Sequence, residues 1–244
     1  MTGEELRRAV ATHRWQHSLR LPDGIVTPGA RSEAALAAEE DALFGAFNLR
    51  GAHVLDAGAA EGHFTFAALR RGARRVLSTD HLAWTLPNAG GEAALRLAAG
   101  ALGHSVETLA ADPRQVTGSF HVTLAMGFYE QSANPIAALR ALSAATTHLM
   151  LLETLQDALD DARPMMVAHT LDRAYGPGIE GWAPNPPLVM HMLLEMGFDR
   201  VLYRTHPEGV ARGIYAALRP AADGRLLEGF AAPWINMTHP TPPA

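Results

Sequence analysis

Short apolar runs alternate with amphipathic stretches through the middle of the chain. The apolar runs, several of which end in Asp or Gly, predict strands at residues 53–58, 74–80, near 105–110, 120–126 and 147–153. Apolar residues at helical spacing predict intervening helices at 61–72, near 91–102 and 134–145. Strands that alternate with helices build a parallel sheet covered on both faces. The pattern therefore predicts an α/β fold.

The flanking segments predict a cap, a lid and a tail around this core. Two helices, at 2–14 and 31–47, enclose a turn-rich loop with two possible short strands. The stretch 155–185 is rich in Asp, Pro and Gly without a clear period, and we expect a lid there. A helix at 187–196 and strands near 199–205 and 211–218 close the fold.

These segments divide the chain into three parts. We expect an N-terminal helical cap with a covering loop at 1–48, a core at 49–220 that includes the lid, and a tail at 221–244. The tail is rich in Pro and Ala and carries Phe230 and Trp234, which we expect to pack on the surface or in a homodimer.

Composition excludes several kinds of chemistry. A chain of 244 residues that is 48% hydrophobic is expected to be globular, and its net charge of −5 gives no general attraction to nucleic acid or anionic membranes. All 20 basic residues are Arg, and Cys is absent. Lysine Schiff bases, Walker-type lysines, thiol nucleophiles and thiolate metal sites are therefore excluded. The amino terminus lacks the pattern of a signal peptide and the apolar runs are short, so we expect a cytoplasmic protein without a membrane partner.

The most informative spacing is Asp56-x-Gly58-x-x-x-Gly62, where the first core strand meets its helix. The two glycines permit a tight turn and a close approach of backbone to a ligand at the helix amino terminus. A dinucleotide fingerprint would need further glycines where Ala60 and His63 stand, which disfavours NAD. Acidic residues end the next two strands, at positions suited to a ribose and to an adenine amine: Asp80 and Asp112.

With these motifs, residues 50–218 resemble the class I S-adenosylmethionine-dependent methyltransferases. The resemblance implies a Rossmann-like sheet, mostly parallel with an antiparallel last strand, and S-adenosylmethionine as cofactor. It implies that the cofactor is bound by the turn after the first strand, the acidic strand ends, the end of the fourth core strand and the covering loop. These residues are Trp15, Thr27, Asp56, Gly58, Ala59, Ala60, Gly62, Asp80, His81, Asp112, Met126 and Gly127.

A narrower resemblance is to the methyltransferases related to the tRNA wobble-uridine carboxymethyltransferase. It is carried by the covering loop, by the ends of the fourth and fifth core strands and by Trp182-Ala-Pro184-Asn185-Pro186. Glu130 stands where that subgroup usually has His, and the lysine that helps to read a carboxylated cofactor is absent. Ordinary S-adenosylmethionine is therefore the expected cofactor, and the acidic charge disfavours tRNA.

Methyl transfer is an in-line displacement, so the protein must hold the acceptor and let its proton leave. Four residues are candidates for these tasks: His17, Tyr129, Glu130 and Glu153. His17 could instead bind a turn carbonyl, Glu130 could pair with an Arg, and Glu153 could cap a loop. The twelve His are scattered, and we expect no metal site.

We therefore expect methyl transfer to a hydroxyl or amine of a small-molecule acceptor, with S-adenosylhomocysteine as product. The Arg- and Ala-rich composition suggests a bacterial source and a specialised metabolite as acceptor. The alternatives are wobble-uridine tRNA modification, a catalytically silent cofactor-binding protein, and a reaction that uses the sulfonium without methyl transfer.

Overall fold

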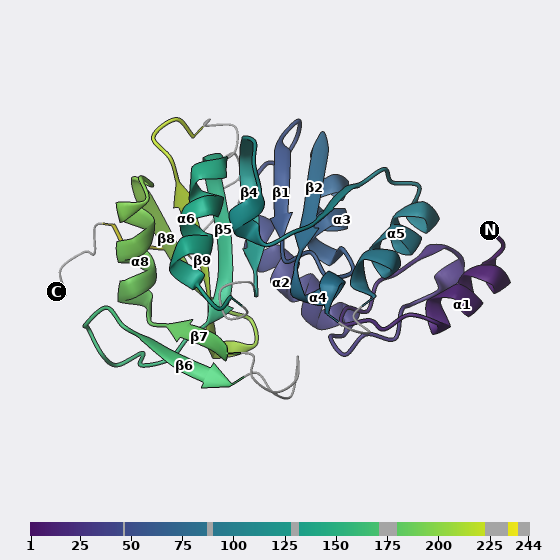
Figure 1. Cartoon of the computed structure of the whole chain (residues 1–244), viewed down its shortest axis with the longest axis horizontal. Helices are drawn as coiled ribbons and strands as arrows, with labels where there is room; N and C mark the ends of the chain where they lie inside the picture. The colour runs from purple at the N-terminus through teal and green to yellow at the C-terminus, as the bar shows by residue number, and fades with distance from the viewer. Residues whose placement is uncertain (46, 87–89, 128–131, 171–179, 223–233, 239–244) are drawn as a thin grey trace.

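The computed structural model describes the chain except residues 46, 87–89, 128–131, 171–179, 223–233 and 239–244. The core of the protein is a β-sheet. Within the described residues the sheet has eight strands in the order β10-β8-β9-β5-β4-β1-β2-β3 (Figure 1). In chain order they are β1 (His53–Ala57), β2 (Arg75–Asp80), β3 (Glu107–Ala110), β4 (Phe120–Met126), β5 (Thr146–Leu155), β8 (Arg200–His206), β9 (Gly209–Leu218) and β10 (Ile235–Asn236).

Strand directions follow the predicted topology. The five strands β1 to β5 are parallel, and β9 runs antiparallel to both β5 and β8. The predicted α/β fold, mostly parallel with an antiparallel last strand, is confirmed. The chain adds β2 and β3 on one side of β1 and then places β4 on the other side, so the strand order reverses between β1 and β4. Open α/β sheets bind ligands at the carboxyl ends of the strands on either side of such a switch point.

Helices cover both faces because successive residues of each strand point to opposite sides. Val54 packs in the core cluster that includes α2 (Glu33–Phe44) and α3 (His63–Arg70). Leu55 belongs to the cluster on the other face, with α6 (Pro135–Ala145) and α8 (Pro186–Glu195). In Figure 1, α6 and α8 lie in front of the sheet.

The N-terminal cap is anchored by a third apolar cluster. Helix α1 (Gly3–Ala11) buries Leu6 and Val10 against α5 (Gly91–Leu102), and Trp15 joins them. The observed helix α1 is shorter than the helix predicted at 2–14, because Thr2 caps its start and the chain turns after Ala11. The following loop contains a 3-10 turn (Pro22–Gly24) and two isolated bridges, His17 to Arg31 and Arg20 to Val26, in place of the two possible short strands.

The predicted lid region contains a hairpin that the sequence pattern did not indicate. Strands β6 (Met166–Thr170) and β7 (Glu180–Pro184) pair antiparallel beside the main sheet (Figure 1). The amide of buried Asn185 fixes the loop that precedes the hairpin, since it donates to the carbonyls of Asp161 and Arg163. The stretch 155–185 is rich in Asp, Pro and Gly and has no clear period, so its two strands gave no signal.

Two smaller elements complete the described part of the chain. The one-turn helix α4 (Leu82–Thr85), which follows β2, was not predicted, and Pro113–Gln115 forms a 3-10 turn.

In the tail, Trp234 stacks edge-on against Phe47, with ring centroids 5.8 Å apart, whereas Phe230 lies outside the described residues. Of the helices described, none combines the length and apolarity needed to cross a membrane.

Candidate active site

The turn after β1 has the sharp backbone that its glycines predict. Gly58 and Gly62 adopt φ values of 94° and 93°, and the N–H of Gly58 donates to the carbonyl of Thr79 at 2.8 Å. A Cβ on Gly62 would lie 3.0 Å from atoms of Leu95 and Phe66. Ala60 also has a positive φ, 46°, which is uncommon for a residue with a side chain. The turn therefore brings backbone, and little side chain, to the cavity edge.

Asp80 ties this turn to the end of β2. Its Oδ2 accepts from the N–H of Ala60 at 3.0 Å, and its Oδ1 accepts from the N–H of Ala83 at 2.8 Å. Burial raises the pKa of this carboxyl, and the hydrogen bonds from the two backbone N–H groups oppose the shift. Each carboxylate oxygen has a second lone pair, so Asp80 can still accept a ligand hydroxyl from the cavity.

Asp56 lies beneath the turn and is not among the residues that line the cavity. It is fully buried, and the hydroxyl of Thr65 donates to its Oδ2 at 2.6 Å. Burial raises the pKa of the Asp56 carboxyl to about 6, although the Thr65 hydrogen bond opposes the shift. The hydrogen bond from Thr65 joins the end of β1 to α3 beneath the turn.

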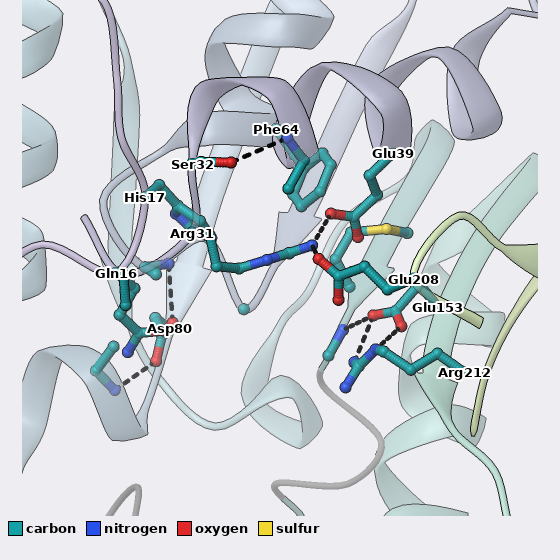
Figure 2. Close-up of a pocket in the computed structure, with 17 residues that line it drawn as sticks. Gln16, His17, Arg31, Ser32, Glu39, Phe64, Asp80, Glu153, Glu208 and Arg212 are labelled. Carbon is teal, nitrogen blue, oxygen red and sulfur yellow. Dashed lines mark hydrogen bonds and ion pairs between the residues drawn. The ribbon is translucent and has the colours of Figure 1, made fainter. Parts of the chain in front are cut away.

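A cavity of about 480 Å³ opens at this edge of the sheet (Figure 2). Seven of the residues that we predicted from the sequence line it, at the turn, at strand ends and in the covering loop: His17, Gly58, Ala60, Asp80, Met126, Gly127 and Glu153. The remaining described lining residues are Gln16, Ala30, Arg31, Ser32, Ala35, Glu39, Phe64, Ala83, Glu208 and Arg212. The cavity thus extends from the first two strand ends, past β4, to β5 and β9.

His17 enters the cavity wall from the covering loop and pairs with a residue that we did not predict. Its Nδ1 lies 3.2 Å from Oε2 of Glu61, and both side chains are buried. The ring of His63 lies 5.7 Å away, and burial, with the nearby His17, lowers its pKa to about 4. His63 is therefore neutral near pH 7, and its ring adds no charge beside His17. Glu61 lies between Gly58 and Gly62 in the turn, where no hydrophobic periodicity marks it as a site residue.

Glu153 has both oxygens occupied. Oε2 accepts from the N–H of Gly127 at 3.0 Å and from Nη2 of Arg212 at 2.8 Å, and Oε1 accepts from Nε of Arg212. Figure 2 shows the two side chains side by side at one end of the cavity. A carboxylate with these partners orients its neighbours, Gly127 and Arg212.

A second charged group joins the N-terminal part of the chain to the turn between β8 and β9. Nη2 of Arg31 lies 2.6 Å from Oε2 of Glu39 and 3.1 Å from Oε1 of Glu208. Burial alone would raise the pKa of Glu39, but His206 and Arg31 outweigh it and lower that pKa. Arg31 bridges two carboxylates that are 169 positions apart in the sequence (Figure 2). A periodic pattern carries no signal for such a contact.

Glu39, Glu153 and His206 form the group of metal-ligand types that the described residues bring within 4.8 Å of one another. Nδ1 of His206 accepts the N–H of Glu208 at 3.0 Å, so the proton of the neutral ring is on Nε2. That nitrogen faces Oε1 of Glu39 at 3.3 Å. In this tautomer Nε2 carries the proton and offers no lone pair to a metal.

Several predicted cofactor residues are held away from the cavity lining. Trp15 donates from Nε1 to the carbonyl of Val10 at 2.9 Å, and the hydroxyl of Thr27 donates to the carbonyl of His17 at 2.7 Å. Asp112 pairs with Arg114. Ala59, Gly62 and His81 lie at the turn and after β2, next to lining residues. Tyr129 and Glu130 lie outside the described residues.

Comparisons with known proteins identify the fold. No protein-family model and no curated protein matches the sequence. The N-terminal domain of EvdMO1 with SAH bound is 20% identical, with a TM-score of 0.66 over 90% of this chain and 97% of that one. Magnesium protoporphyrin IX methyltransferase (ChlM) from Synechocystis PCC 6803 with bound SAM is 15% identical, with a TM-score of 0.55 over 76% and 78%.

A third similar structure comes from Burkholderia thailandensis. Its 1,6-didemethyltoxoflavin-N1-methyltransferase, with bound 1,6-didemethyltoxoflavin and S-adenosylhomocysteine, is 21% identical, with a TM-score of 0.56 over 78% of this chain and 80% of that one. At such low identity the likeness establishes the architecture. The chain has the Rossmann-like fold of the class I S-adenosylmethionine-dependent methyltransferases.

Proposed function

We propose that this protein transfers a methyl group from S-adenosylmethionine to a hydroxyl or amine of a small-molecule acceptor. The observation that carries the proposal is the cavity at the carboxyl edge of the sheet, which runs from the Gly58 turn and Asp80 past Gly127 to Glu153 and Arg212. This edge is where open α/β sheets bind ligands. The similar structures with bound SAM or SAH add support.

One end of the cavity suits the cofactor. The turn from Gly58 to Gly62 presents backbone next to the start of α3, and Asp80 presents a carboxylate for the two ribose hydroxyls. Asp112 would lie near the adenine, and Met126 and Gly127 would flank the sulfonium. The methyl group would then face the end of the cavity that holds Glu153 and Arg212.

His17 is the described residue best suited to accept a proton. Its Nδ1 lies 3.2 Å from Oε2 of Glu61, and with the ring proton on Nδ1 the other nitrogen, Nε2, keeps a lone pair. The acceptor atom would attack the methyl carbon as the carbon–sulfur bond breaks, the bonding electrons would go to sulfur, and the acceptor proton would go to Nε2. Glu153 would position Gly127 and Arg212. Tyr129 and Glu130 follow β4 in the sequence and remain predicted acceptor contacts.

The other functions considered have less support. Modification of tRNA would require a protein with net charge −5 and no Lys to bind a polyanion. A catalytically silent cofactor-binding protein would share the same turn and the same Asp80. It would differ from the proposed enzyme in binding the cofactor without turnover.

Calorimetric titration with S-adenosylmethionine and S-adenosylhomocysteine tests the cofactor assignment. We expect binding by the intact protein, and a loss of roughly tenfold or more in Asp80→Ala because a buried charge-assisted contact is removed. Asp161→Ala is the matched control, since it removes a partly exposed carboxylate that pairs with Arg163 away from the cavity lining. Folded protein that binds neither ligand would contradict the proposal.

Substitution of His17 tests the chemical step. We expect His17→Asn to lower the methyl-transfer rate by about 100-fold or more for a hydroxyl acceptor, while S-adenosylhomocysteine affinity changes little. Turnover by the intact protein with an unchanged rate in His17→Asn would remove His17 from the mechanism. Tight cofactor binding without turnover on any acceptor would favour the silent protein.

A further inference from the structure

Arg31 is held by one buried carboxylate and one exposed carboxylate. Its Nη2 lies 2.6 Å from Oε2 of Glu39, whose side chain is 1% exposed, and it donates to Oε1 of Glu208 at 3.1 Å. The side chain of Glu208 is 45% exposed, and that of Arg31 is 30% exposed. Arg31 therefore has an inner partner in the protein interior and an outer partner at the surface.

The backbone of Arg31 is fixed within the covering loop, residues 12–32, which connects α1 to α2. The N–H of Arg31 donates to the carbonyl of Gln16 at 2.8 Å, and its carbonyl accepts from the N–H of Ser18 at 2.9 Å. Arg31 is thus anchored at its backbone by the first part of the loop and at its guanidinium group by Glu39.

Glu208 belongs to the turn between β8 and β9 and lines the same cavity as Arg31. Its N–H donates to Nδ1 of His206 at 3.0 Å, which holds the backbone of the turn. In Figure 2 the side chain of Arg31 extends from the covering loop toward Glu39 and Glu208. The Arg31–Glu208 pair therefore joins the covering loop to this turn where the cavity lining reaches solvent.

The outer contact is the one that can open. Ion pairs between exposed side chains contribute little to stability, because water and salt ions screen them. Separation of Arg31 from Glu39 would leave a buried charge without its partner, which is far more costly. When the contact opens, Glu208 is therefore released and Arg31 stays with Glu39.

We propose that the Arg31–Glu208 pair is a strap across the entrance of the cavity, and that ligands enter and leave when Glu208 releases Arg31. The inference rests on the proposed function, because the cofactor product is the ligand that reports on it. Rotation of one exposed side chain opens the strap. An exposed pair is closed only a few times more often than it is open, so the strap slows exchange by roughly two- to fivefold.

Surface plasmon resonance with S-adenosylhomocysteine measures both rates of exchange. A strap acts on the path and not on the bound state, so we expect Glu208→Ala to raise the association and dissociation rates by the same factor, roughly two- to fivefold. Kd should change by less than about twofold. Glu208 is exposed in a turn, so its truncation preserves the fold.

Glu33→Ala is the matched control for this variant. Glu33 forms an exposed ion pair with Arg20 of the same covering loop, but neither residue lines the cavity. We expect this variant to change neither rate.

A covalent link between the two sides tests the strap in the opposite direction. The chain has no Cys, so Ala30→Cys combined with Glu208→Cys supplies two unique thiols for a short, reducible bifunctional reagent. Ala30 is exposed and precedes Arg31 in the covering loop. We expect the link to lower both rates by about tenfold or more relative to the unlinked double variant, and its reduction to restore them.

The outcomes separate this inference from the function on which it rests. If folded protein does not bind S-adenosylhomocysteine, the proposed function falls and the inference falls with it. If that ligand binds but Glu208→Ala or the link leaves the exchange rates unchanged, ligands enter elsewhere and the strap is wrong. A change in Kd without matching changes in both rates would place Glu208 in contact with the ligand and would also overturn the inference. In these last two cases the cofactor assignment stands.

Discussion

The two ends of the cavity are built from different material. At the end that we propose for the cofactor, backbone of the β1 turn is held by Asp80, and these groups follow neighbouring strands. At the end that we propose for the acceptor, charged side chains come from α2, β5, β9 and two loops, and they meet through Arg31 and Arg212. The first end depends on backbone conformation, and the second depends on pairing between distant charges.

The two ends therefore differ in the substitutions that they tolerate. A turn with positive φ at Gly58 and Gly62 is strained when either glycine gains a side chain. A network of ion pairs tolerates changes of shape but is sensitive to the loss of one partner, because the other charge is left buried. Changes at one end are therefore expected to leave the other end largely intact.

The largest effect is expected from a methyl group on the turn. Gly62→Ala places a Cβ 3.0 Å from Leu95 and Phe66 at a φ of 93°. We expect a loss of about 3 kcal/mol in the free energy of unfolding, measured by urea denaturation, and weaker cofactor binding. Gly100→Ala is the control: it lies inside α5 with open space around its Cβ, and we expect it to stabilise by up to about 1 kcal/mol. Equal stabilities of the two variants would show that the turn is not constrained.

The next effect concerns the carboxyl beneath the turn. Because the folded pKa of Asp56 is raised to about 6 from 3.8, the folded state holds more protons than the unfolded state between these values. The contribution of Asp56 to stability is thus present below about pH 4 and is lost as pH rises to 6, at up to about 1.4 kcal/mol per pH unit.

Asp56→Asn isolates this dependence because its amide oxygen can still accept from Thr65. We expect the intact protein to lose stability relative to Asp56→Asn as the pH rises from 4 to 6.5 in urea denaturation series. A constant difference between the two proteins across that range would mean that the carboxyl titrates normally.

A smaller effect is expected when the acceptor end loses one charge. Glu39→Gln leaves Arg31 with Glu208 as its remaining carboxylate partner, and we expect a loss of about 2 kcal/mol in the free energy of unfolding. Cofactor affinity should change less than twofold. Glu107→Gln, at an exposed pair with Arg75, should cost about 0.5 kcal/mol or less. Similar losses in both variants would mean that the buried pair contributes no more than a surface pair.

The smallest effect is expected at the third strand end. The carboxylate of Asp112 is already engaged by Arg114, so Asp112→Ala should weaken S-adenosylhomocysteine binding by about threefold or less in calorimetry. A loss as large as that of Asp80→Ala would show that Asp112 holds the adenine directly.

The clustering of the residues that we propose for the cofactor end was predictable from the sequence because these residues are local to strand ends. A strand followed by Asp56-x-Gly58 fixes where the turn lies, and the strand order then brings Asp80 beside it. Elements with a long, regular pattern, such as α5 and β4, were predicted to within a residue or two. The hairpin of β6 and β7 and the single turn of α4 were not, because their residues show no clear hydrophobic period.

The acceptor end was only partly predictable because side-chain pairing over long separations leaves no periodic trace. Glu153 was identified from its place at the end of a strand, but Arg31, Glu39 and Arg212 were not. Their contacts require the covering loop to return next to β9, which tertiary packing decides. The same holds for Glu61, whose partner His17 is 44 positions away.

A crystal structure of the protein with S-adenosylhomocysteine tests the central claim most directly. We predict that the ribose hydroxyls bind Asp80 and that the sulfur faces the end of the cavity lined by Glu153 and Arg212. A cofactor with its ribose away from Asp80, or with its sulfur directed away from Gly127, would contradict the division of the cavity into a cofactor end and an acceptor end.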